Sequence, residues 1–309
     1  MRIGKIIKSI LLSFLLLFVG IFLYHSISSY ERLPFVGEMI DIGDYQLHMY
    51  ATGNKSTLPT IVLESGSGTP SSFSDWQYIQ PELSKITRVI SYDRAGYGWS
   101  EGANNDRTAE QIVQDLHKML EVSGEKGPYI LVGHSFGGFT MQLFAHDYPK
   151  EVVGIVLLDS SIIDKGPKVT DSSVFIQGTL RKVGVMRILG EIGALPVPEA
   201  VMTSEISREF LYRNFYNADQ QSELKLMETT EEQLIPVHNQ GLGTIPISIL
   251  SSRAEEKEHK DWQALQDNLL QLSTNSNRLI VENSSHYIHH DQPEIVIDSI
   301  LDMLNETTN

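Results

Sequence analysis

The stretch Gly133-His134-Ser135-Phe136-Gly137 has the pattern Gly-x-Ser-x-Gly and decides the fold. The short apolar run 129–132 before it is typical of a strand, and the residues that follow it predict a helix. A serine at such a sharp strand-to-helix turn has a strained backbone and an exposed hydroxyl. Gly133 and Gly137 suit the turn because a Cβ at either position would crowd the neighbouring elements. The context therefore predicts that Ser135 is a nucleophile.

Composition limits the classes of protein that need to be considered. The chain has 309 residues, and what remains after the first thirty fits one large α/β domain with or without an inserted cap. A net charge of -15 disfavours nucleic acid as a partner, because phosphate binding requires a basic face. The same charge disfavours broad adhesion to anionic lipid. The absence of cysteine excludes disulfides, thiolate catalysis and cysteine-type zinc sites.

The N-terminal segment 1–30 has the features of a membrane anchor or a signal segment. Arg2, Lys5 and Lys8 precede an apolar run at 10–24 that approaches the ~20 residues needed to span a bilayer. Positive charge before the run predicts a cytoplasmic N-terminus. We therefore expect a single-pass cell-membrane protein with an extracytoplasmic catalytic domain, joined to the helix by a tether at 25–36. The alternative is a secreted protein, released by cleavage of a signal peptide.

Strand and helix patterns alternate along most of the chain. A hairpin is expected at 39–50, and further strands are expected at 60–64, 89–93, 129–132, 152–158, 246–250 and 278–281. Helices are expected at 108–122, behind Ser135, and at 293–304. This alternation predicts an α/β fold with a mostly parallel central sheet flanked by helices.

The alternation lapses between about 164 and 243, where the pattern is helical. We interpret 164–243 as a helical cap inserted into a core made of 31–163 and 244–309. The insertion follows the carboxyl end of a strand, where open α/β sheets bind ligands, so the cap is expected to cover the site. Extra helices packed beside the sheet are the alternative.

A serine hydroxyl needs a base, and His286 is the best candidate for that role. It follows the last predicted strand by a short loop, and a histidine late in the chain fits the order in which a serine at such a turn comes first and its base last. His289 and His290 lie further from the strand end, and His134 is expected to support the turn around Ser135.

Two carboxylates compete for the role of the acid that orients this base. Asp159 directly follows the strand 152–158, and Glu255 follows the strand 246–250 by a short loop. Either one would hold the imidazole tautomer and stabilise the imidazolium. Asp159 could instead make a loop bond, and Glu255 could be a solvated charge in the polar run 253–258. We favour Asp159 and keep Glu255 as the alternative.

The oxyanion hole requires two backbone N–H donors. Phe136, directly after the nucleophile, is expected to supply one of them. The second is expected from the loop 64–69, with Ser67 preferred and Gly66 next, because glycines allow that backbone to approach closely.

The glycine-rich loop 93–100 is not a nucleotide-binding loop, since it lacks the third glycine and the helix start of that motif. We expect it to shape the pocket wall, and we expect no metal and no organic cofactor.

Four stretches together resemble the α/β-hydrolase-fold enzymes over most of residues 38 to 304. They are 64–68, 92–100, 133–138 and 285–294. The chain is most similar to bacterial serine-nucleophile members with a helical cap. The resemblance implies a triad of Ser135, His286 and an acid that cleaves ester, amide or thioester bonds.

The chain departs from this family where members often carry the acid in a Gly-x-x-Asp loop. Here the loop is Ser252-Arg253-Ala254-Glu255, which has neither the glycine nor the aspartate, and this departure favours Asp159. Serine at the nucleophile position argues against dehalogenase and epoxide hydrolase chemistry, because those relatives use a carboxylate there.

The expected function is hydrolysis of a carboxylic ester, through an acyl-enzyme, on a small-molecule acyl substrate. One alternative is an aminopeptidase of the proline-iminopeptidase kind, which needs acidic cap residues to hold the substrate amine. The candidates for that role are Glu191, Glu199, Glu205 and Glu209. Another alternative is a non-catalytic hydrolase-fold binding protein.

Overall fold

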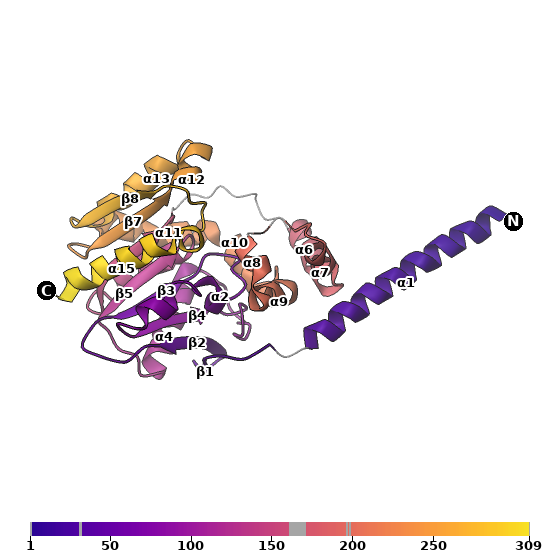
Figure 1. The fold of residues 1–309 in the computed structure, drawn as a ribbon, viewed down its shortest axis with the longest axis horizontal. Helices are drawn as coiled ribbons and strands as arrows, with labels where there is room; N and C mark the ends of the chain where they lie inside the picture. Colours follow the sequence, from indigo (N-terminus) through magenta and orange to yellow (C-terminus); the bar gives the residue numbers. More distant parts are fainter. Residues whose placement is uncertain (1, 31–32, 161–170, 196, 198, 309) are drawn as a thin grey trace.

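The computed structural model describes residues 2–30, 33–160, 171–195, 197 and 199–308. An eight-stranded sheet forms its centre, with the strands in the order β1-β2-β4-β3-β5-β6-β7-β8 (Figure 1). The strands are β1 (Glu38–Asp41), β2 (Gln46–Thr52), β3 (Thr60–Glu64), β4 (Val89–Asp93), β5 (Tyr129–His134), β6 (Val152–Leu158), β7 (Ile247–Ser252) and β8 (Ser276–Val281). β2 runs antiparallel to β1 and β4, and the other neighbouring strands are parallel. The predicted fold class is confirmed.

The parallel strands β3 to β8 all end at the same edge of the sheet. Every residue of β3, β4 and β5 is buried, as expected for strands that are covered on both faces. Loops that follow the carboxyl ends of these strands therefore meet in space, although they lie far apart in the sequence.

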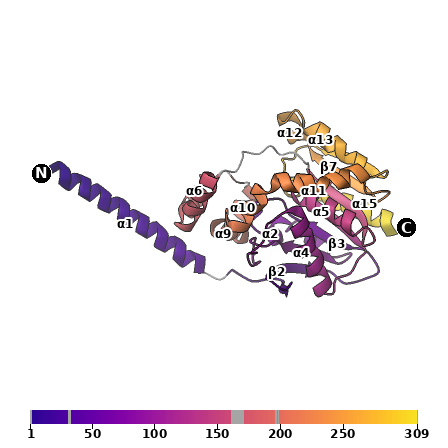
Figure 2. The same ribbon diagram turned by 180° about the vertical axis from the view of Figure 1, so that it is seen from behind.

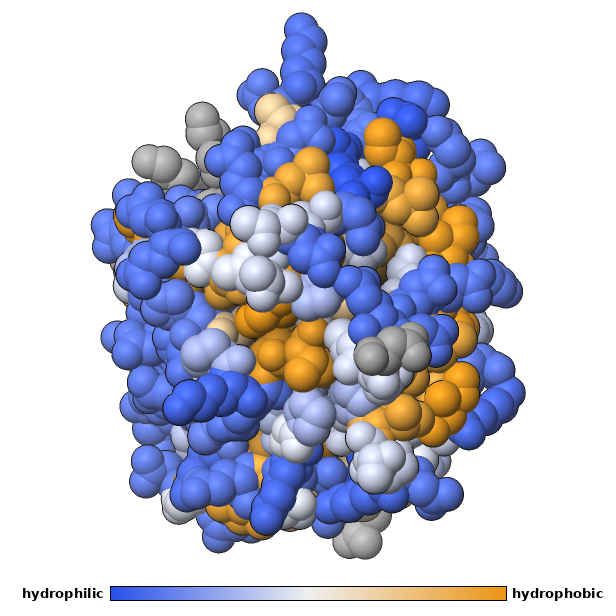
Figure 3. Space-filling view, turned by 90° about the vertical axis from the view of Figure 1, so that its left-hand side faces the viewer, coloured by the Kyte–Doolittle hydropathy of each residue, from blue (hydrophilic) through white to orange (hydrophobic). Residues whose placement is uncertain are grey.

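Two helical layers cover the sheet. One layer contains α4 (Ala109–Val122), α5 (Gly137–Asp147), α11 (Met227–Gln240) and α13 (Trp262–Leu269), followed by a short 3₁₀ turn at Leu270–Leu272 (Figure 2). The other layer contains α2 (Ser72–Asp75), α3 (Gln80–Leu83), α14 (Ile288–Asp291) and α15 (Pro293–Thr308). The face of the molecule opposite α1 shows hydrophilic side chains around smaller hydrophobic groups (Figure 3).

The stretch between β6 and β7 is helical in its described part. It holds α6 (Asp171–Lys182), α7 (Val185–Glu191), α8 (Glu199–Thr203), α9 (Glu205–Asn214), α10 (Ala218–Lys225) and then α11. α6 to α9 lie between α1 and the sheet (Figure 1), whereas α11 packs against α4 and α5. The predicted start of the cap at 164 lies outside the described residues, and the boundaries 164–243 stay a prediction.

The N-terminal helix α1 spans Arg2–Tyr30, so the first half of the expected tether is helical. Its segment Lys5–Ser29 is long and apolar enough to cross a membrane, and an 18-residue window within it has a mean hydropathy of 2.6. Most of its large apolar side chains are exposed, as Leu16 and Phe14 illustrate.

Gly133 provides a test of the packing at the turn between β5 and α5. A Cβ at Gly133 would lie 2.6 Å from the carbonyl oxygen of Gly137, and backbone cannot move aside as a flexible side chain can. We expect Gly133→Ala to lower the free energy of unfolding by roughly 1–3 kcal/mol. Gly178→Ala is the matched control, because its Cβ would meet nothing nearer than 3.5 Å. Urea denaturation of both variants checks this, and equal stabilities would contradict the packing account.

Candidate active site

Ser135 lies at the turn between β5 and α5 with a φ of 52°. Such a positive φ is strained for a residue other than glycine and is typical of functional positions. The Ser135 N–H donates to the Leu158 carbonyl at 3.0 Å, and its carbonyl accepts from the Ser160 hydroxyl at 3.0 Å. The backbone of Ser135 is therefore held on both sides. Within the described part of the chain its own hydroxyl has no hydrogen-bond partner, which leaves Oγ available.

His286 and Asp159 are joined by a hydrogen bond. Nδ1 of His286 lies 2.8 Å from Oδ2 of Asp159. The other carboxylate oxygen of Asp159 accepts from the backbone N–H of Ser252 at 2.9 Å and from Nε1 of Trp262 at 2.9 Å. Asp159 is fully buried, so these three partners fix the carboxylate and, through it, the imidazole plane.

Glu255, the alternative acid, makes no hydrogen bond to His286 among the described residues. It belongs to the first turn of α12 (Arg253–Glu258), which Ser252 caps through its hydroxyl. Burial raises the pKa of Glu255; the electrostatic interaction with His286 opposes this rise and repulsion from Asp159 adds to it. In a capping box, the carboxylate three residues after the cap accepts the N–H of the capping residue. Here the backbone N–H of Ser252 donates its hydrogen bond to Asp159 instead.

The loop that follows β3 lies directly against the nucleophile. A Cβ added to Gly66 would lie 3.2 Å from Cβ of Ser135 and 2.9 Å from Nδ1 of His134. Phe136 and Ser67 have backbone N–H groups with no acceptor in the described part of the protein. The N–H of Gly66, the other candidate donor of this loop, also has no acceptor among the described residues, so these N–H groups are available to a bound ligand.

Arg94 fixes this loop, and its role was not predicted from the sequence. Its guanidinium donates to the carbonyls of Ser65 at 2.7 Å and of Gly66 at 3.0 Å. The carbonyl of Gly66 and the N–H of Ser67 belong to one trans peptide and point in opposite directions. Holding that carbonyl on Arg94 therefore turns the Ser67 N–H away from Arg94.

Arg94 is itself buried within a cluster of charged and phenolic groups. It pairs with Glu64 at 2.5 Å and with Glu223 of α10 at 3.0 Å. Tyr92 donates to Glu64, and Tyr97 donates to Glu223 at 2.9 Å. Burial raises the pKa of Glu64 to about 7, although Arg94 and Tyr92 oppose that rise. The cluster ties the loop 64–69 to the helical insertion.

A second polar cluster lies behind His286. Asp75 accepts from Nε2 of His289 at 3.0 Å and from Nε2 of His290 at 2.9 Å, and His134 bonds the His286 carbonyl at 3.0 Å. Burial opposes the ionisation of Asp75, but the two neighbouring imidazoles hold its pKa well below its ordinary value. Asp75, His134 and His289 are close enough to hold a metal ion, with ligand atoms within 4.8 Å of one another. Hydrogen bonding accounts for the pairing of Asp75 with His289. Oδ2 of Asp75 and the Nδ1 atoms of His134 and His289 are buried without a hydrogen-bond partner among the described residues.

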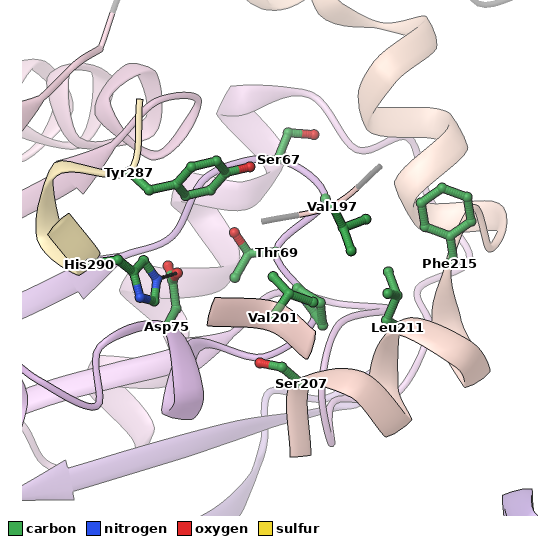
Figure 4. A pocket seen from close by; sticks show the side chains of 12 residues that line it. Ser67, Thr69, Asp75, Val197, Val201, Ser207, Leu211, Phe215, Tyr287 and His290 are labelled. Carbon is green, nitrogen blue, oxygen red and sulfur yellow. Dashed lines mark hydrogen bonds and ion pairs between the residues drawn. The ribbon is translucent and has the colours of Figure 1, made fainter. Parts of the chain in front are cut away.

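A cavity of about 200 Å³ opens beside these groups. Ser67, Thr69, Asp75, Tyr287 and His290 form its core side (Figure 4). The insertion supplies the opposite wall, which consists of Val197, Val201, Ser207, Leu211 and Phe215. One end of the cavity is therefore polar, and the wall from the insertion is mainly apolar.

The raised pKa of Glu64 predicts how stability depends on pH. Between about pH 5 and pH 7 the folded state holds this proton more firmly than the unfolded state does. The contribution of Glu64 to stability is thus complete at low pH and is lost as the pH rises toward 7. We expect Glu64→Gln to flatten the decline in the free energy of unfolding across this range. Urea titrations of both proteins at several pH values test this, and parallel curves would contradict it.

Comparison with known proteins agrees with this architecture. A family model described as alpha/beta hydrolase fold matches residues 59–182. The uncharacterized protein YqjL of Bacillus subtilis (strain 168) is 31% identical over 247 residues, which are 79% of this chain and 83% of that protein.

Two solved structures illustrate the shared fold. The enol-lactonase from Burkholderia xenovorans LB400 is 19% identical with a TM-score of 0.66, over 87% of this chain and 100% of that one. A thermophilic esterase from Thermogutta terrifontis is 20% identical with a TM-score of 0.64, over 88% of this chain and 99% of that one. The sheet, the elbow at Ser135 and these similarities agree, and the chain belongs to the α/β-hydrolase family.

Proposed function

We propose that this protein is a serine hydrolase that cleaves carboxylic esters through an acyl-enzyme. The observation that carries the proposal is the 2.8 Å hydrogen bond between Asp159 and His286 beside the strained elbow of Ser135. Nucleophile, base and orienting acid are the three parts that such a reaction needs.

In the proposed reaction His286 takes the proton of the Ser135 hydroxyl while Oγ attacks the ester carbonyl carbon. The N–H groups of Phe136 and Ser67 donate to the oxyanion that forms. The alcohol leaves with the proton from His286, and an acyl-enzyme remains on Ser135. His286 then accepts a proton from water as the water attacks the acyl carbon. The bond between that carbon and Oγ of Ser135 breaks, Oγ takes the proton back from His286, and the acid is released. Asp159 keeps the imidazole in one tautomer throughout.

Arg94 acts in this proposal as a positioning residue. By holding the carbonyl of Gly66, it supports the orientation of the Ser67 N–H before substrate binds. A donor that is already oriented costs no reorganisation when charge develops on the substrate. Arg94 is also paired with Glu223 of α10. The position of Arg94 therefore depends on the position of α10.

The environment of the cavity supports an ester substrate over the amine of an aminopeptidase. Glu209 is paired with Arg187 at 2.5 Å and is not available to a substrate amine. The other candidates, Glu191, Glu199 and Glu205, are exposed and do not line the cavity. Asp75 does line it, but its Oδ1 already accepts from two histidines, and its Oδ2, which has no partner among the described residues, is buried.

We further propose that α1 is a retained membrane anchor. Most of its apolar segment Lys5–Ser29 is exposed, whereas its C-terminal end packs against α7. A helix removed as a signal peptide would not need that contact.

The identity of the acid can be tested directly. We expect Asp159→Asn to lower kcat on a short-chain p-nitrophenyl ester by about 10³–10⁴-fold, because an asparagine cannot hold the productive imidazole tautomer. Glu255→Gln is the matched control and should stay within about twofold of the parent, since Glu255 makes no hydrogen bond to His286 among the described residues. Steady-state kinetics of both variants check this. A large loss in Glu255→Gln together with an active Asp159→Asn would overturn the assignment.

A further inference from the structure

The C-terminal end of α1 packs against α7. His25 is buried although most of α1 is exposed. A Cβ at Gly184, the N-cap residue of α7, would lie 2.4 Å from Cβ of His25. Gly184 has a φ of 83°, so glycine suits this position both by its backbone conformation and by the space that His25 occupies.

Arg187 joins α1 to two helices of the insertion. It is 2% exposed and forms a two-pronged ion pair with Glu209 of α9, at 2.5 and 2.8 Å. The same guanidinium reaches Nδ1 of His25 at 3.4 Å and Oγ of Ser29 at 3.5 Å, and it lies over the ring of Tyr212. A planar guanidinium with five donors is suited to holding several partners in one geometry.

This junction is connected to the cavity. α9 carries Glu209, which Arg187 holds, and also Ser207 and Leu211, which line the cavity. The cavity wall therefore has a fixed position relative to the end of α1. Figure 1 shows α6 and α7 between α1 and the rest of the hydrolase domain.

The surface near the junction suits the boundary of a membrane. Ile176 of α6 is 55% exposed and Ile192, directly after α7, is 69% exposed. Large exposed apolar side chains beside a membrane-spanning helix are suited to insertion at the lipid boundary. From α6 to α9 the sequence carries as many basic as acidic residues, while the whole chain has a net charge of -15. An anionic surface therefore repels the acidic remainder of the protein but not this part.

We infer that α1 holds the insertion against the bilayer, and that the substrate is a long-chain acyl ester drawn from the adjacent leaflet. This inference rests on the ester hydrolysis proposed above. The apolar wall formed by Val197, Val201, Leu211 and Phe215 receives the hydrocarbon chain. The polar end of the cavity beside Ser67 and His290 receives the ester group.

The test uses the full-length protein in phosphatidylcholine vesicles with two substrates. One is p-nitrophenyl palmitate dissolved in the same vesicles, and the other is p-nitrophenyl acetate in the surrounding water. We expect His25→Ala to lower the rate on the palmitate ester about fivefold. A change of this size corresponds to the loss of one polar contact. The rate on acetate should stay within about twofold, because His25 lies outside the reacting groups.

Ile27→Ala is the matched control, since Ile27 lies on the same part of α1 but is 67% exposed. It should change neither rate. Equal losses on both esters in His25→Ala, or no loss on either, would overturn the inference. A parent protein that hydrolyses acetate but not palmitate would overturn it as well and leave the proposed ester hydrolysis intact. A parent protein that is inactive on both would refute the ester hydrolysis itself.

Discussion

The carboxylate of Asp159 binds groups from three separate parts of the chain, and the geometry of the candidate site depends on it. Ser252 ends β7, Trp262 begins α13, and His286 lies in the loop after β8. Only the parallel order of β6, β7 and β8 brings these groups to one point. A buried carboxylate with three good donors is stable, whereas one that lost them would carry a large desolvation penalty. The hydrogen bonds therefore hold the edge of the sheet together and orient the imidazole.

The sequence predicted those features that local patterns determine. The strand before Ser135 and the helix after it both depend on neighbouring residues. Local sequence patterns could not decide between Asp159 and Glu255 as the acid, because both residues follow the ends of parallel strands. The spacing Ser252-x-x-Glu255 is a capping-box pattern, and it offered one signal that Glu255 belongs to the start of a helix.

The role of Arg94 lay beyond sequence reasoning for the same physical reason. Its partners Glu64 and Glu223 are 30 and 129 residues away, so no short motif contains them. Arg94 directly follows the buried strand β4, and a buried guanidinium needs a partner of opposite charge. Its position was therefore a signal that a carboxylate lies nearby. The length of α1 was also underestimated, because the polar residues after Tyr24 resemble a linker in isolation but pack against α7 in the structure.

The central claim is that Ser135 is an activated nucleophile, and covalent labelling tests it most directly. The folded protein is treated with a fluorophosphonate probe, digested, and mapped by mass spectrometry. The account predicts a single adduct on Ser135, formed far more slowly in the unfolded chain, where the hydrogen-bonded pair of His286 and Asp159 is lost. No adduct on the folded protein, or an adduct on another serine only, would contradict it.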